Sequence, residues 1–127
     1  MISFEEAGVI LDELADELPE EFYRELNGGI ILVPEAKPHS SGGNLYILGE
    51  YHNDRTGYGG LGRYIAVYYG SFVKLYANMG AEYQKEQLRK TLIHEFTHHI
   101  ESLAGDRSLE KKDAETMERY KKRYIRK

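Results

Sequence analysis

The sequence contains no cysteine and no tryptophan, only three prolines, and no long apolar run. The absence of cysteine excludes disulfides, thiolate metal sites and a cysteine nucleophile, so any metal must be bound by histidines and carboxylates. No segment approaches the roughly 18 consecutive apolar residues that a membrane span requires. The N-terminus is acidic and lacks the basic start of a signal peptide, so we expect a cytoplasmic protein without membrane association.

The remaining composition is that of a small globular protein. Its 127 residues are 41% apolar and 30% charged, which predicts a single domain over residues 1–127. The net charge of −4 argues against general nucleic-acid binding as the function. Residues 1–25 are acidic and residues 119–127 are basic, which we interpret as two solvated helix faces. A basic tail that docks on RNA or a partner is the alternative, and the composition is compatible with a monomer.

Apolar periodicity and turn residues predict an α+β domain. Ser3 and Glu6 form a capping box ahead of a first helix, and Pro19 ends this helix or begins a second short one. Strands are predicted at 30–33, 45–52 and 63–69, and helices at 71–79, 82–104 and 108–126. This order favours N-terminal helices, a small three-stranded, mostly antiparallel sheet, and two C-terminal helices.

The long helix contains the run His94-Glu95-Phe96-Thr97-His98-His99, an H-E-x-x-H pattern. Residues four apart share one face of a helix, so His94 and His98 can bind one Zn²⁺, or another divalent metal, from the same side. Glu95 can then act as the general base on a metal-activated water. At about 100° per residue, the two histidines lie opposite an apolar stripe, whereas His99 lies on the core side. The stripe consists of Leu88, Leu92, Phe96, Ile100 and Leu103. Ordinary solvated side chains are the alternative interpretation of the motif.

A catalytic zinc site needs a third protein ligand, and the sequence offers several carboxylates. Asp113 is the preferred candidate because it interrupts an otherwise uncharged stripe of the last predicted helix. Asp106 follows Gly105, where the chain leaves the long helix. Glu101 shares the histidine face, but it lies seven residues after His94, roughly 10 Å along the axis. Glu110 and Glu115 are weaker candidates, and Asp113 can instead orient a ligand histidine.

The chain resembles the minimal zincin-like metallopeptidases of bacteria. The resemblance extends over residues 18–22, 30–33, 48–51, 65–69 and 91–99 and includes the pattern H-E-x-x-H-H. In the commonest sequence pattern of this family, a Gly lies three residues after the second histidine of H-E-x-x-H, and an Asp lies three residues after that Gly. Those positions are Glu101 and Ala104 in this sequence, and the nearest Gly-Asp pair is Gly105-Asp106. The resemblance implies a zincin-like α+β fold and peptidase activity.

A peptidase also needs a surface for its substrate and a donor for the oxyanion. We expect the strand at 45–52 or the strand at 63–69 to be the sheet edge on which a peptide or protein substrate pairs. Tyr51 and Tyr69 are the candidate oxyanion or substrate-binding groups, with His52 and Tyr68 as further candidates. The glycine-rich segment 57–62 is interpreted as a turn, with a flap over the site as the alternative.

The sequence therefore predicts a zinc-dependent metallopeptidase in which His94, His98 and a third carboxylate bind the metal and Glu95 is the base. Two other classes of protein remain as alternatives. One is a non-catalytic metal- or peptide-binding module that keeps the motif. The other is a regulatory protein whose basic C-terminal helix contacts RNA or a partner.

Overall fold

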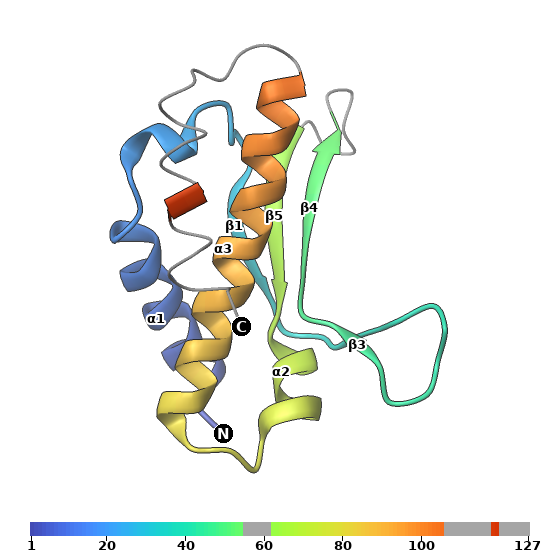
Figure 1. Ribbon diagram of the computed structural model, residues 1–127. Helices are drawn as coiled ribbons and strands as arrows, with labels where there is room; N and C mark the ends of the chain where they lie inside the picture. The colour runs from blue at the N-terminus through green and yellow to red at the C-terminus, as the bar shows by residue number, and fades with distance from the viewer. Residues whose placement is uncertain (55–61, 106–117, 120–127) are drawn as a thin grey trace.

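The computed structural model describes residues 1–54, 62–105 and 118–119 (Figure 1). The predicted helix at 108–126 lies outside the described residues, except for Glu118 and Arg119, which are helical. The elements, in chain order, are helix α1 (Phe4–Asp16), 3₁₀ helix η1 (Glu20–Tyr23), strands β1 (Gly29–Val33), β2 (Lys37–Pro38), β3 (Tyr46–Ile47), β4 (Gly49–Asp54) and β5 (Gly62–Tyr68), and helices α2 (Tyr69–Tyr76) and α3 (Ala81–Gly105).

The N-terminal segment follows its local sequence signals. The Ser3 hydroxyl accepts the Glu6 N–H at 3.0 Å, and the Glu6 carboxylate accepts the Ser3 N–H at 2.7 Å. The predicted capping box is therefore confirmed. Pro19 precedes a four-residue 3₁₀ turn, shorter than the helix predicted there, because the backbone leaves helical geometry at Arg24 (ψ 125°) and Glu25 (φ 60°).

The three-stranded sheet has the order β1-β5-β4. Strand β5 pairs with β4 in the antiparallel direction and with β1 in the parallel direction. The prediction of a mostly antiparallel sheet is therefore wrong for half of its pairings. The parallel pairing arises because β1 pairs with β5, the last strand in the described part of the chain, and not with the strand that follows β1 in sequence.

The strand predicted at 45–52 is divided in two at Leu48. Its first part, β3, pairs with β2 in a separate two-stranded ribbon, and its second part, β4, pairs with β5. The Leu48 carbonyl still accepts the Tyr68 N–H at 2.9 Å, so Leu48 joins the ribbon to the main sheet. Strand β4 lies at the sheet edge, and no other described strand pairs with its outer side.

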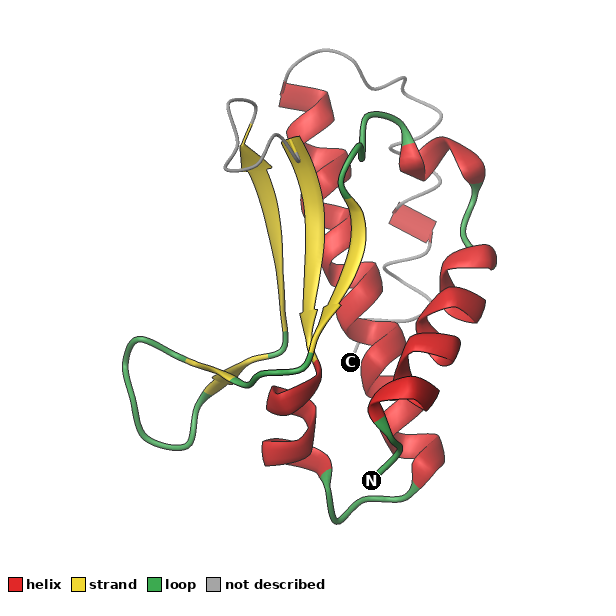
Figure 2. Ribbon diagram, turned by 180° about the vertical axis from the view of Figure 1, so that it is seen from behind, coloured by secondary structure: helices red, strands yellow, loops and turns green. Residues whose placement is uncertain are grey.

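Helices α1 and α3 pack on one face of the sheet, whereas no helix drawn in Figure 2 covers the face turned toward the viewer. The core lies between the helices and this inner face, and it includes Phe22, Ile65, Val67 and Phe96. Helix α3 runs beside both β4 and β5, which places its exposed side next to the edge strand (Figure 1). Among the helices in the described part of the chain, none is long and apolar enough to cross a membrane.

Candidate metal centre and cleft

Helix α3 buries one face and exposes the opposite one. The predicted apolar stripe is confirmed, since each of its members is no more than 2% exposed: Leu88, Leu92, Phe96, Ile100 and Leu103. His94 and His98 are exposed on the opposite face. The helix is therefore anchored through the core, and this anchoring holds the two histidines in fixed positions at the surface.

The two exposed imidazoles face each other. Their Nε2 atoms are 3.2 Å apart, and their rings are perpendicular, with an angle of 87° between the planes. Two imidazole ligands of a tetrahedral Zn²⁺, each at about 2.05 Å from the metal, have nitrogens about 3.3 Å apart. The separation of the two Nε2 atoms is therefore close to that of two imidazole ligands of one zinc ion.

The described residues do not complete a metal site. Nowhere among them do three His, Asp or Glu side chains form a group that could hold a metal ion. The Glu101 carboxylate lies 3.8 Å from Nδ1 of His98, the nitrogen that does not face His94. This separation is longer than a hydrogen bond, so Glu101 acts on His98 through its charge. Asp113 and Asp106 lie outside the described residues, and the third ligand stays a prediction.

Glu95 is buried, in contrast to the two histidines beside it. Its side chain lies against β4 and the residue is 6% exposed. Burial raises the pKa of Glu95 to about 7, the Glu50 carboxylate contributes to this rise, and a hydrogen bond from the Tyr51 backbone N–H opposes it. A carboxylate with this pKa can exchange a proton near neutral pH, as a general base must.

Glu50 supplies the negative charge that acts on Glu95. Burial alone would raise the pKa of Glu50, but hydrogen bonds from Lys37 Nζ at 2.6 Å and the Tyr68 hydroxyl at 2.7 Å hold it below its ordinary value. Glu50 is thus ionised at neutral pH. His52 is also near, with Nε2 3.3 Å from the Glu50 carboxylate, and its ring stacks on Tyr64.

Strand β4 presents its outer backbone groups beside Glu95. In the antiparallel ladder with β5, Leu48 is hydrogen-bonded to Tyr68, so residues 49, 51 and 53 direct their backbone groups to the outer edge. The hydrogen bond from the Tyr51 N–H to Glu95 agrees with this alternation. Glu95 therefore lies at the same edge on which an added strand would pair.

Gly49 allows β4 and α3 to approach closely. A Cβ at this position would lie 2.8 Å from Thr91 Cγ2 and 3.3 Å from Glu95 Cγ. Real side chains essentially never tolerate the first of these distances, so any larger residue would push the strand and the helix apart. Gly49 thus fixes the depth at which Glu95 lies under the strand.

Two depressions that share lining residues flank the histidine pair. The larger cleft, about 710 Å³, lies between residues 49–53 of β4 and the C-terminal half of α3, including His94, His98, Glu101 and Ser102. A smaller pocket of about 400 Å³ lies between residues 46–49 and Gln87, Lys90 and Thr91. We call it the Lys90 pocket. His94, Glu95 and Gly49 line both depressions, so the candidate metal centre lies where the two meet.

His99 has a structural position, as the helix geometry predicts. It is fully buried; Nε2 donates to the Arg24 carbonyl at 2.8 Å, so Nδ1 accepts the Tyr51 hydroxyl at 2.8 Å. Burial lowers the pKa of His99, which favours this neutral ring. The imidazole thereby ties α3 to β4 and to the segment after η1.

The candidate oxyanion groups have different surroundings. Tyr51 lines the larger cleft, but its hydroxyl is engaged by His99, and the Tyr69 hydroxyl donates to the Ile2 carbonyl at 2.5 Å. Tyr69 and Tyr68 line neither depression, whereas His52 lines the larger cleft. Among the described candidates, the structure thus brings Tyr51 and His52 together with Glu95.

Sequence reasoning missed the roles of Gly49 and Glu50. A glycine inside a predicted strand signals close approach of another backbone or ligand, and this signal was available for Gly49. Glu50 carries no such local signal, because its effect on Glu95 depends on the packing of β4 against α3.

The chain is similar to known proteins in sequence and in fold. A family model described as zincin-like metallopeptidase matches residues 37–116, more than half of the chain. The chain therefore belongs to the zincin-like metallopeptidase family. A solved structure with 36% sequence identity, a conserved hypothetical protein from T. thermophilus, superposes with a TM-score of 0.71. The match covers 82% of this chain and 99% of that one. No curated protein matches the chain.

Proposed function

We propose that this protein is a zinc-dependent peptidase whose centre is His94, Glu95 and His98. One observation carries the proposal: two imidazole nitrogens 3.2 Å apart lie next to a buried carboxylate at the outer edge of β4. A third ligand, Asp113 in our preferred assignment, completes the ligand set with His94 and His98. The substrate is a peptide or protein segment that pairs with β4 in extended conformation.

Zn²⁺ held by the two imidazoles would polarise a peptide carbonyl and acidify a water molecule. The Glu95 carboxylate accepts the proton of the attacking water and later delivers it to the leaving amine. In the metal-free protein the pKa of Glu95 is about 7, so this side chain can hold or release a proton near neutral pH, as both transfers require. The outer backbone groups of Gly49 and Asn53 orient the substrate chain, and His52 is the candidate donor to the oxyanion.

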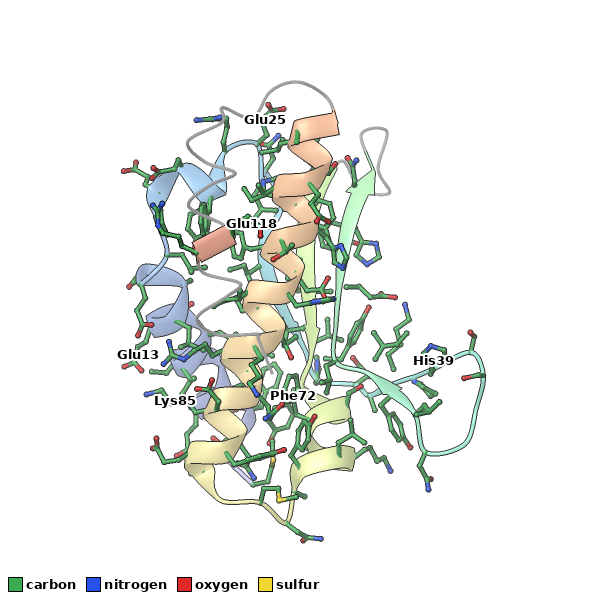
Figure 3. The ribbon with its side chains drawn as sticks, in the orientation of Figure 1. Glu13, Glu25, His39, Phe72, Lys85 and Glu118 are labelled. Atoms are coloured by element: carbon green, nitrogen blue, oxygen red, sulfur yellow. The ribbon has the colours of Figure 1, made fainter. Side chains whose placement is uncertain are left out.

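The experiment compares zinc-loaded wild type with Glu95→Gln on a peptide mixture, with products identified by mass spectrometry. The wild type should cleave peptides, and Glu95→Gln should lose activity by about 10²–10⁴-fold while keeping its zinc, because only the base is removed. Glu13→Gln, an exposed substitution in α1, is the control and should retain full activity (Figure 3). A wild type that binds zinc and cleaves nothing would instead identify a non-catalytic metal- or peptide-binding module.

A further inference from the structure

Lys90 is the positively charged group nearest the candidate centre in the Lys90 pocket. It is half-buried and lies four residues before His94, so the two side chains are on the same face of α3. Among the described residues, its amino group has no ion-pair partner, whereas the adjacent Arg89 is paired with Glu17 at 2.6 Å. A half-buried cation that lines a pocket and has no ion-pair partner in the described part of the chain is suited to bind an anion.

The opposite side of the centre carries the opposite charge. Glu50 and Glu101 line the larger cleft, and none of the described residues that line it is a lysine or an arginine. Glu50 is paired with Lys37 Nζ at 2.6 Å, so the acidic character of this cleft comes mainly from Glu101. The groove along β4 is therefore acidic beyond His98 and basic beyond His94. An extended peptide with one charged end would favour one orientation in it over the reverse.

Strand pairing predicts the same orientation. Residues 46–49 lie against the N-terminal half of α3 and residues 49–53 against its C-terminal half, so β4 and α3 run in the same direction. A peptide that pairs with β4 in the more stable antiparallel manner runs in the direction opposite to both β4 and α3. Its C-terminal half then lies over the Lys90 pocket, and its N-terminal half lies over the acidic cleft.

We propose that Lys90 binds a carboxylate of the substrate on the C-terminal side of the cleaved bond, and this inference rests on the peptidase function proposed above. Four helical residues advance about 6 Å, which corresponds to about two residues of an extended chain. The carboxylate therefore belongs to the first or second residue after the bond. It can be an acidic side chain or the terminal carboxylate of a short peptide, and the two sources share the same chemistry.

Direct binding tests this inference without turnover. Fluorescein-labelled hexapeptides of one neutral sequence are titrated into zinc-loaded Glu95→Gln protein and followed by fluorescence polarisation. The set comprises a neutral amide, amides with one aspartate or one lysine placed at each position in turn, and the free acid. We expect the best carboxylate-bearing peptide to bind about 10-fold more tightly than the neutral amide. Tight binding of the aspartate amides identifies a side-chain carboxylate, and tight binding of the free acid alone identifies a chain terminus.

The charge-reversed variant Lys90→Glu, in the same background, should favour the lysine peptides, and Lys90→Met should remove the preference. Lys85→Glu is the matched control, because position 85 is about 140° around the helix from position 90 and its side chain lies on the α1 side (Figure 3). Lys85→Glu should bind each peptide with the same affinity as the Glu95→Gln protein.

The inference would be overturned if Lys90→Glu kept the carboxylate preference unchanged. It would also be overturned if the zinc-loaded Glu95→Gln protein bound none of the peptides or showed no preference among them. Cleavage of the same peptides by zinc-loaded protein with native Glu95 is scored separately. Binding with the expected preference but without cleavage contradicts the peptidase function alone, and cleavage with a preference that Lys90→Glu leaves intact contradicts the role of Lys90 alone.

Discussion

Replacement of Glu95 by glutamine should stabilise the metal-free protein at alkaline pH. In the folded protein, Glu95 keeps its proton up to a pKa of about 7, well above its ordinary value of 4.5. The folded state therefore binds more protons than the unfolded chain between these pH values. Stability consequently falls as the pH rises through this window, and Glu95→Gln removes that loss because glutamine does not ionise.

The expected magnitude follows from the pKa difference. At 1.36 kcal/mol for each pKa unit, the wild type loses about 3 kcal/mol of unfolding free energy between pH 4 and pH 8 through this one group. The two proteins should thus be similarly stable at pH 4, and Glu95→Gln should be about 3 kcal/mol more stable at pH 8. For a domain of this size the difference corresponds to a melting temperature higher by on the order of 10 °C.

Urea unfolding in EDTA, followed by circular dichroism from pH 4 to pH 8.5, measures this difference. Glu13→Gln, an exposed position of α1, is the control for loss of one carboxylate. Parallel pH profiles for wild type and Glu95→Gln, or a wild type that is the more stable protein at pH 8, would refute the reasoning. Either result would mean that burial and Glu50 do not disfavour the Glu95 carboxylate.

Three further predictions concern the surroundings of the centre. Gly49→Ala should cost about 1–3 kcal/mol of stability by urea unfolding, since its Cβ would meet Thr91 and Glu95, and it should lower kcat in the peptide assay. His99→Phe should cost about 2–4 kcal/mol in the same unfolding assay, because the Tyr51 hydroxyl and the Arg24 carbonyl lose their partner; no loss would contradict the structural role of His99. Asp113→Asn should weaken zinc binding, measured by competition with a chromogenic chelator, by more than the roughly 10–100-fold typical of an outer carboxylate, and Asp106→Asn should have a smaller effect.

Local patterns predicted the elements that depend on neighbouring residues. The period of apolar residues in α3 identified Leu88, Leu92 and Phe96 as buried, and the Ser3–Glu6 spacing identified the start of α1. The spacing of His94 and His98 likewise predicted two side chains on one face, and the structure places their Nε2 atoms 3.2 Å apart. Such features are set within one or two turns of chain, so sequence alone contains them.

Features that depend on distant pairings were not predictable in the same way. The parallel pairing of β1 with β5 joins residues about 35 positions apart, and no local signal encodes it. The helical wheel places Glu95 beside the histidines, but its burial results from the close approach of Gly49 and its raised pKa partly from Glu50. The spacing of His94 and His98 likewise does not select the third ligand, so Asp113 and Asp106 both stay candidates.

The zinc-binding isotherm tests the central claim most directly. Zinc is titrated into wild type, His94→Ala, His98→Ala and, as control, His39→Ala, a histidine of the β2–β3 ribbon that lies away from α3 (Figure 3). We predict one zinc ion per chain for wild type and His39→Ala, and loss of that binding in both of the other variants. A wild type without stoichiometric zinc, or α3 variants that bind zinc as the wild type does, would contradict this claim.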